Sequence, residues 1–299
     1  MKTQTRGSLL LLLCAAIWGA AFTAQSAGMA YVGPFTMGAA RFFLAGLVLL
    51  PVIAVLDRSG LSANRPTDRS SRRAQLRAGL TCGVLLFAAS SLQQLGLLTT
   101  SAGKSGFITA LYLIFVPIIG LFTGRKPPGV LLVCVPLALA GLYLLCVKGR
   151  LSLVPGDWLT LGCAVIFTVH ICYISAVSPH VDCVRLSCQQ FFVCAALCAA
   201  VMVITETPSW AALAQCWLPI VYAGVCSGGI GYTLQIIGER DVPPAIASLL
   251  MSLESVFAAL FAWILAGERL STQELAGCAL MFTAILLSQL PPRAGVSTS

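Results

Sequence analysis

One acidic residue, Glu254, lies inside a long apolar stretch of the sequence, roughly ten residues from either end of it. A carboxylate at that depth in a membrane costs several kcal/mol unless it is paired or protonated. Such a group could take up and release a proton, or contact a substrate, as its access alternates between the two sides. The alternative is a neutral glutamic acid that donates a hydrogen bond between helices. Glu254 is the only acid that we predict deep within a span.

Arg41 is the basic residue that could act together with Glu254. It lies about seven residues into another apolar stretch, and a guanidinium group stays charged at any physiological pH. It could hold a substrate carboxylate or pair with Glu254. It could also extend its long side chain to the nearer membrane surface.

Uncharged polar and aromatic side chains add further candidates. Gln93 and Gln235 could bind polar substrate atoms or bond across helices. His170 could change its charge near neutral pH or serve as a neutral hydrogen-bonding residue. The aromatic candidates could line a cavity for planar or apolar solutes, or simply fill helix interfaces: Trp18, Tyr112, Phe167, Tyr173, Tyr222 and Tyr232.

Motifs of other chemistries are absent from the sequence. It contains no Walker lysine motif, no H-E-x-x-H and no G-x-S-x-G, so we predict neither an ATP-driven pump nor one of the common hydrolases. The thirteen cysteines are odd in number and include no C-x-x-C. We interpret them as small hydrophobic residues and predict no cofactor and no metal.

The elements that hold these side chains must be membrane helices, because the chain lacks the polar residues that a water-soluble surface needs. Of 299 residues, 58% are hydrophobic and 9% are charged, whereas a soluble domain carries about 25% charged residues. This composition excludes a cytosolic enzyme, a nucleic-acid binder and a disordered chain. The predicted fold class is an all-α integral membrane protein.

Ten apolar stretches have about the 20 residues that a membrane helix needs. The connections between them are short and leave no room for a soluble domain. The first stretch follows Lys2 and Arg6, as in a signal peptide, but we expect it to be retained because it has a counterpart in the second half. The ten predicted helices span residues 8–27, 34–56, 76–97, 103–123, 129–146, 157–177, 184–205, 215–237, 245–266 and 271–290.

The distribution of basic residues predicts the orientation. The longest connection, residues 57–74, carries five arginines. If the N-terminus is cytoplasmic, thirteen lysine and arginine residues fall on the cytoplasmic side and four on the other. Because lysine and arginine favour the cytoplasmic side, we expect a multi-pass protein of a bacterial cytoplasmic membrane with both termini in the cytoplasm.

The two halves of the sequence repeat each other weakly. A shift of 149 positions places Cys14-Ala15 on Cys163-Ala164 and Phe42-Phe43 on Phe191-Phe192, and a shift of 142 places Gln93 on Gln235. Five helices per copy is an odd number, so the second copy must enter the membrane from the opposite side. We therefore predict a five-plus-five inverted repeat, residues 1–150 and 151–299, which together form one transport unit with substrate near the midplane.

Four groups of residues resemble the EamA-type branch of the drug/metabolite transporter superfamily. They are Ala15-Ala16-Ile17-Trp18-Gly19 with Phe22; Ala40-Arg41-Phe42; Gln93 through Ser101-Ala102-Gly103 and Pro117 to Gly124-Arg125; and Ser248-Leu249 through Glu254 to Gly267-Glu268-Arg269-Leu270. The resemblance covers residues 8–290. It implies ten helices in an inverted repeat and transport of small metabolites, often outward.

The sequence departs from this family at one motif. The family often has Glu-Pro in helix 9, whereas Ser255 follows Glu254 here, and the matching position in helix 4, Leu113, is not proline either. The sequence therefore leaves open whether helices 4 and 9 are broken.

We interpret the chain as a secondary transporter, not an enzyme, that moves a small organic metabolite, such as an amino acid or a drug-like compound, by alternating access. Export follows from the family resemblance, and proton coupling through Glu254 is a hypothesis. The expected partners are the substrate, the lipid bilayer and protons, without nucleic acid, and the oligomeric state stays open.

Three alternatives also stay open: a lipid-linked-sugar or headgroup flippase, a non-transporting membrane partner, and an intramembrane enzyme. Helices 1, 3, 4, 6, 8 and 9 should line the cavity, with the substrate-binding candidates Glu254, Gln93, Gln235, Tyr112, Trp18, Arg41, His170 and Tyr232.

Overall fold

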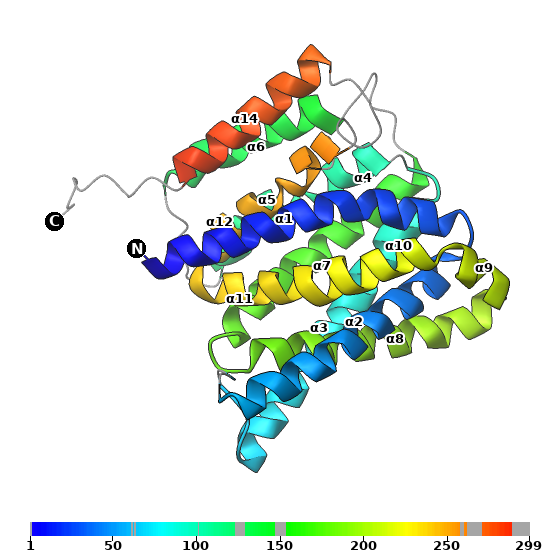
Figure 1. The fold of residues 1–299 in the computed structure, drawn as a ribbon. Helices are drawn as coiled ribbons and strands as arrows, with labels where there is room; N and C mark the ends of the chain where they lie inside the picture. The colour runs from blue at the N-terminus through cyan, green and yellow to red at the C-terminus, as the bar shows by residue number, and fades with distance from the viewer. Residues whose placement is uncertain are drawn as a thin grey trace.

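The chain is built from helices throughout the part that the computed structural model describes, residues 2–60, 62, 64–100, 102–122, 129–146, 154–257, 260–261 and 271–288. No strand occurs in those residues. The helices, shown in Figure 1, are α1 (Lys2–Met29), α2 (Pro34–Arg58), α3 (Arg69–Gly96), α4 (Ala102–Thr109), α5 (Tyr112–Phe122), α6 (Leu131–Cys146), α7 (Pro155–Val177), α8 (Cys183–Thr205), α9 (Trp210–Gln215), α10 (Trp217–Val221), the π-helix η1 (Tyr222–Tyr232), α11 (Thr233–Asp241), α12 (Pro244–Met251) and α14 (Thr272–Ser288).

These helices supply the membrane spans that the composition requires. Within the described residues, seven helical segments are long and apolar enough to cross a membrane, and three shorter apolar helices, Leu131–Leu144, Pro244–Phe257 and Thr272–Ser288, accompany them. Large apolar side chains such as Phe122, Leu132 and Ile204 are almost fully exposed on the outside. Such side chains suit contact with lipid tails rather than water. The predicted all-helical membrane fold is confirmed.

Helices of the first half pack mainly against helices of the second half. Helix α2 lies along α8, α6 along α14, α3 along α7, and α1 along η1 and α11 (Figure 1). An inverted repeat would produce such pairing. The repeat and its boundary at residue 150 remain predictions.

Glycines allow the closest of these approaches. A Cβ atom on Gly141 of α6 would lie 2.6 Å from the carbonyl oxygen of Gly277 in α14, and one on Gly156 of α7 would collide with the carbonyl oxygen of Gly96 in α3. Small residues let membrane helices approach closely enough for extensive van der Waals contact. The α6–α14 and α3–α7 pairs therefore depend on glycine.

The fourth span is broken although it has no proline at the break. Helix α4 ends at Thr109, Ala110 and Leu111 form a turn, and α5 begins at Tyr112. At the turn, the N–H of Leu111 donates to the carbonyl of Ile108 at 3.1 Å, three residues back instead of four. This tighter 3₁₀-type bond redirects the chain in mid-span.

The ninth span repeats the same break 142 positions later. Helix α12 ends at Met251, Ser252 and Leu253 form a turn, and residues 254–257 are helical again. The N–H of Leu253 donates to the carbonyl of Leu250 at 3.2 Å, as in the fourth span. The question that the missing prolines left open is thus answered: both spans are broken. Tyr112 and Glu254 each follow their break directly.

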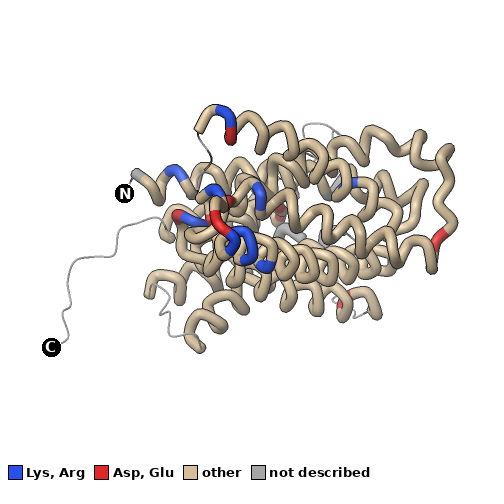
Figure 2. The backbone as a smooth tube through the Cα atoms, turned by 90° about the horizontal axis from the view of Figure 1, so that it is seen from below, with Lys and Arg blue, Asp and Glu red and all other residues tan. Residues whose placement is uncertain are grey.

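Charged residues concentrate at one end of the bundle. Figure 2 shows most of the lysine and arginine positions at the end where α1 begins. The end of α2 and the start of α3 contribute there, and Asp68 caps α3 by accepting hydrogen bonds from Ser70 and Ser71. The hydroxyl of Ser71 and these backbone N–H groups hold the pKa of Asp68 below its usual value. This end is the one predicted to face the cytoplasm.

Candidate substrate-binding site

A cavity lies in the middle of the bundle, where the two broken spans meet α1, α2, α3, α7, η1 and α11. Its empty volume, including the part that opens outward, is about 610 Å³. All of the predicted binding residues except His170 are in its wall. The lining residues are Trp18, Ala21, Gln25, Arg41, Gln93, Thr109, Tyr112, Phe167, Ile171, Ser227, Tyr232, Gln235, Met251 and Glu254.

Arg41 faces this cavity from α2. Its side chain is buried, Nη1 donates a hydrogen bond to Oε1 of Gln25 in α1, and the guanidinium carbon lies 4.4 Å from the ring centroid of Phe42. The Nε atom is buried and has no hydrogen-bond partner among the described residues. The interpretation that Arg41 reaches for the membrane surface is therefore wrong. Its positive charge points inward and keeps a free donor.

Glu254 faces the same cavity from the residue after the break in the ninth span. It is 5% exposed, and its carboxyl group makes no hydrogen bond or ion pair with any residue in the described part of the chain. The structure shows no ion pair between Arg41 and Glu254 over that part of the chain, so the pairing that the sequence allowed does not occur. The cavity wall thus carries a guanidinium group and a carboxyl group that do not pair with each other.

Aromatic side chains form a third part of the wall. The indole Nε1 of Trp18 donates to the backbone carbonyl of Ser227 at 3.1 Å, and its ring lies 4.7 Å from that of Tyr232. The Tyr232 ring also meets the edge of Phe191 at 5.6 Å. Ser227 belongs to the π-helix η1, a conformation that is frequent at functional sites. Trp18 thus connects α1 to η1 at the cavity wall.

The two repeat-matched glutamines both line the cavity but bond differently. Nε2 of Gln93 donates to Oγ1 of Thr109 at 3.3 Å, whereas Nε2 of Gln235 donates to Oε1 of Glu239 at 2.8 Å. Oε1 of Gln235 is buried without a partner among the described residues. This amide links the cavity to a second carboxyl group.

His170 does not line the cavity. Its ring is fully buried, and Nε2 lies 3.1 Å from Oε1 of Gln190 in α8. The ring is turned toward α8 because Gln190 is the polar partner that its apolar surroundings offer. His170 is thus a hydrogen-bonding residue between helices, and we leave it out of the proposed site.

Sequence reasoning missed two features of this region. Glu239, two residues before the end of α11, is only 1% exposed, so an acid near the end of a span is buried as well as Glu254. The predicted helix ended at residue 237, two residues before Glu239, although Glu239 lies one helical turn after Gln235 in α11. Thr109 and Met251 also line the cavity. They lie 142 positions apart, so the repeat could have identified them.

Some sequence motifs lie outside the described residues. These are Gly267-Glu268-Arg269-Leu270, Ser101 and Gly124-Arg125, and the side chain of Phe22 is also outside them.

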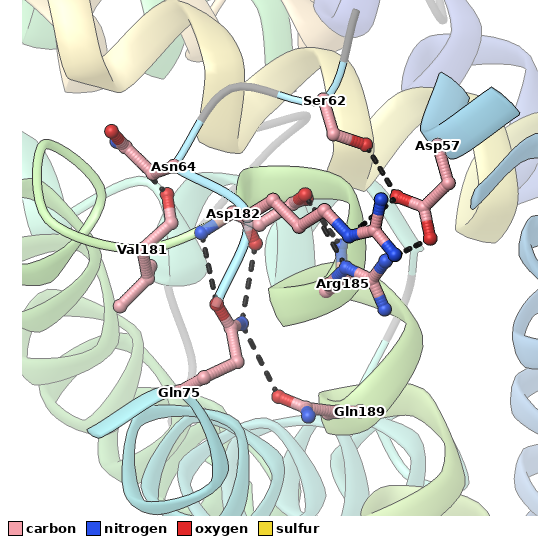
Figure 3. A network of polar contacts seen from close by, with 9 residues as sticks. Asp57, Ser62, Asn64, Gln75, Val181, Asp182, Arg185 and Gln189 are labelled. Carbon is pink, nitrogen blue, oxygen red and sulfur yellow. Dashed lines mark hydrogen bonds and ion pairs between the residues drawn. The ribbon is translucent and has the colours of Figure 1, made fainter. Parts of the chain in front are cut away.

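Away from the cavity, a polar network ties α2, α3 and α8 together (Figure 3). Asp57 at the end of α2 pairs with Arg185 in the first turn of α8 and accepts from Ser62 at 2.7 Å. Gln75 of α3 exchanges two hydrogen bonds with the backbone of Asp182. Here every carboxylate has partners, in contrast to Glu254.

The opposite end of the α2–α8 pair is closed by another carboxylate. Glu206, just after α8, accepts from the backbone N–H groups of Phe35 and Thr36 at 2.8 Å each and from the Thr36 hydroxyl at 2.6 Å. A carboxylate at a helix N-terminus satisfies free N–H groups and the helix dipole. Asp57 and Glu206 lie 149 positions apart, the first repeat shift, and they fasten both ends of the pair.

Comparison with known proteins agrees with this architecture. The sequence model of the EamA-like transporter family matches residues 5–147 and again 154–290. A protein of Archaeoglobus fulgidus, described as an uncharacterized transporter, is 28% identical over 286 residues, which is 94% of this chain and 84% of that protein. One crystal structure superposes with a TM-score of 0.79 over 96% of this chain and 97% of its own, at 21% identity, a likeness of fold alone.

Proposed function

Because the chain belongs to the EamA-like transporter family, and is thus a multi-pass membrane transporter rather than an enzyme, we propose that it exports a small zwitterionic metabolite. The substrate class is an amino acid or a closely related compound. Transport crosses the cytoplasmic membrane by alternating access, with the termini in the cytoplasm. The basic residues at the end of the bundle where α1 begins support this orientation.

One observation carries the proposal: Arg41 and Glu254 face one cavity without pairing with each other. A buried charge without a counter-charge is costly, so the site is complete only when a ligand supplies both signs. A zwitterion does so. Its carboxylate takes the free donors of Arg41, its ammonium group approaches Glu254, and its side chain lies against Trp18 and Tyr232.

Proton coupling follows from the same carboxyl group. The Glu254 carboxylate binds the ammonium group of the substrate, and a proton on Glu254 removes that attraction. Proton and substrate therefore compete, which exchanges one for the other across the membrane. Acidification should weaken substrate binding, and alkalinisation should strengthen it until Glu254 is fully ionised.

The first test is a metabolite profile of cells that express the protein. Wild type, Glu254→Gln and Glu274→Gln are compared at matched membrane levels, and amino acids in the medium and cytosol are followed over time. Glu274 is a buried carboxyl group of α14 that lies outside the cavity wall. We expect a few amino acids to accumulate outside with wild type and Glu274→Gln but about tenfold less with Glu254→Gln, the loss of one charged hydrogen bond.

Binding measurements then test the competition. The affinity of wild type for an exported amino acid should fall as the pH is lowered, whereas that of Glu254→Gln should stay constant. Identical export profiles for the three proteins, or an unchanged pH dependence in Glu254→Gln, would rule out the role of Glu254.

A further inference from the structure

Glu239 is another buried carboxyl group, and the substrate site does not use it. It is 1% exposed, Oε1 accepts the 2.8 Å hydrogen bond from Gln235, and Oε2 is buried without a partner among the described residues. Gln235 itself lines the cavity. The side chain of Gln235 thus connects the cavity wall to the carboxyl group of Glu239, which does not itself line the cavity.

The contacts between α1 and α11 show where Glu239 lies along the bundle. A Cβ atom on Gly7 of α1 would lie 3.0 Å from the carbonyl oxygen of Gly238 and 3.1 Å from Cβ of Asp241, whereas one on Gly231 would lie 2.6 Å from Nε1 of Trp18. Eleven residues of helix span about 16 Å. Glu239 therefore lies between the cavity and the end of the bundle where α1 begins.

The titratable groups around Glu239, among the residues that the structure describes, are cysteines and tyrosines. Those in electrostatic reach are Cys14 of α1, Cys82 of α3 and Tyr112 of α5. Tyr173 of α7 and Cys183 of α8 belong to the apolar cluster around the neighbouring Ile236. Helix α12 carries no titratable residue. In η1, the titratable residue nearest to Glu239 along the chain is Tyr232, which lines the cavity.

The basic residue closest in sequence is engaged elsewhere. Arg240 lies 3.4 Å from Asp241 at the end of α11, and its side chain is 28% exposed. Since no described cation neutralises Glu239, this carboxyl group must be protonated for at least part of the time to remain buried.

Building on the proposed transport function, we propose that Glu239 is a second proton-binding site of the transport cycle, connected to the cavity through Gln235. When substrate displaces the proton of Glu254, the O–H bond of that carboxylic acid breaks and one forms on the Glu239 carboxylate. Water that enters the cavity carries the proton between them. Glu239 then releases it past Asp241 at the end of α11, and no electron transfer is involved.

The first arm of the test measures protonation directly. Purified full-length protein in lipid vesicles is titrated with acid and base while infrared spectroscopy follows the C=O stretch of protonated carboxyl groups. We expect wild type, Glu254→Gln and Glu274→Gln to show a titrating band that Glu239→Gln lacks. A Glu239→Gln spectrum that titrates like wild type overturns the proposal.

The second arm measures coupling. Vesicles take up a mixture of tritiated amino acids, driven either by a pH gradient or by exchange against unlabelled amino acids. Exchange needs no net proton movement, so Glu239→Gln should lower the ratio of pH-driven uptake to exchange by about tenfold or more. Gln235→Leu should lower the same ratio and keep the Glu239 band. An unchanged ratio in Glu239→Gln overturns the proposal.

Failure of the proposed function gives a different result. If wild type neither takes up nor exchanges any of the amino acids, the substrate assignment is wrong, and the infrared titration still decides whether Glu239 binds a proton. If wild type exchanges amino acids and the Glu239 band does not titrate, transport stands and the second proton site is refuted.

Discussion

Arg41 of α2 and Gln190 of α8 are related by the first repeat shift, and each bonds to a polar residue of a neighbouring helix, yet the two pairs face different surroundings. Arg41 of α2 bonds to Gln25 of α1, and Gln190 of α8, 149 positions after Arg41, bonds to His170 of α7. The first pair lines the cavity, whereas both members of the second are fully buried outside its wall. At one of these two positions the charge of Arg41 is available to a ligand. At the other, the amide of Gln190 is engaged in a hydrogen bond between packed helices.

The two broken spans show the same contrast with the halves exchanged. Tyr112 and Glu254 follow equivalent turns, 142 positions apart, and both line the cavity. Here the second half supplies the charge. Each half therefore contributes one ionisable group, Arg41 or Glu254, whose counterpart in the other half, Gln190 or Tyr112, carries no charge. The binding site is thus asymmetric although the positions match. A zwitterion has the same asymmetry.

The largest effect on transport should come from replacing Arg41 by glutamine, the residue that stands 149 positions later. Arg41→Gln removes the charge-assisted hydrogen bonds to the substrate carboxylate, worth about 2–3 kcal/mol. We expect amino acid uptake into vesicles to fall about 100-fold, while uptake of the corresponding amine, which has no carboxylate, changes little. Arg77→Gln, at an exposed position of α3, is the matched control. An equal loss for the amino acid and the amine would refute carboxylate recognition by Arg41.

An effect on stability should come from the reverse exchange, in which Gln190 is given the arginine that stands at position 41. Gln190→Arg places a charge in a site that is fully buried and has no counter-charge among the described residues. We expect a loss of about 3 kcal/mol in the free energy of unfolding, seen as a lower thermal midpoint in detergent. Gln215→Arg, at an exposed position of α9, should leave the midpoint unchanged. A stable Gln190→Arg protein would mean that the two pairs are equivalent.

The smallest effect should come from removing the second pair altogether. The double variant His170→Leu with Gln190→Leu replaces both partners, so no polar group is left unsatisfied, and we expect stability within about 1 kcal/mol of wild type. Transport should also be retained. His170→Leu alone leaves Gln190 without its partner and should cost about 1–3 kcal/mol. Loss of transport in the double variant would show that this pair has a role beyond packing.

Much of the fold was predictable, because each span carries its own hydropathic signal. Where the structure describes both ends of a span, most predicted ends lie within a few residues of the observed ones, although α1 and α3 begin six and seven residues earlier than predicted. The breaks at Leu111 and Leu253 were not predictable, since they arise without proline from backbone hydrogen bonds that shift from four residues back to three. The repeat shift of 142 positions nevertheless places Leu111 on Leu253.

The sequence predicted which residues line the candidate site but not which hydrogen bonds they form with one another. Charged and amide residues in apolar sequence must face one another or a cavity, so Arg41, Gln93, Gln235 and Glu254 stood out. Periodicity alone could not show that Arg41 selects Gln25 rather than Glu254, because that choice depends on the packing of α1 against α2. The burial of Glu239 was not predicted for another reason. It stands beside Arg240 and Asp241 at the end of an apolar stretch, and such a charged run is typical of a loop.

The cross-half pairing of α2 with α8 has a consequence for how the protein is made. Asp57 leaves the ribosome well before Arg185, and the α2 N-terminus well before Glu206. Until α8 has entered the membrane, the carboxylate of Asp57 and the free N–H groups of α2 have to be satisfied by water at the bilayer surface. The α2 helix therefore gains its partners at both ends only after α8 has been synthesised and inserted.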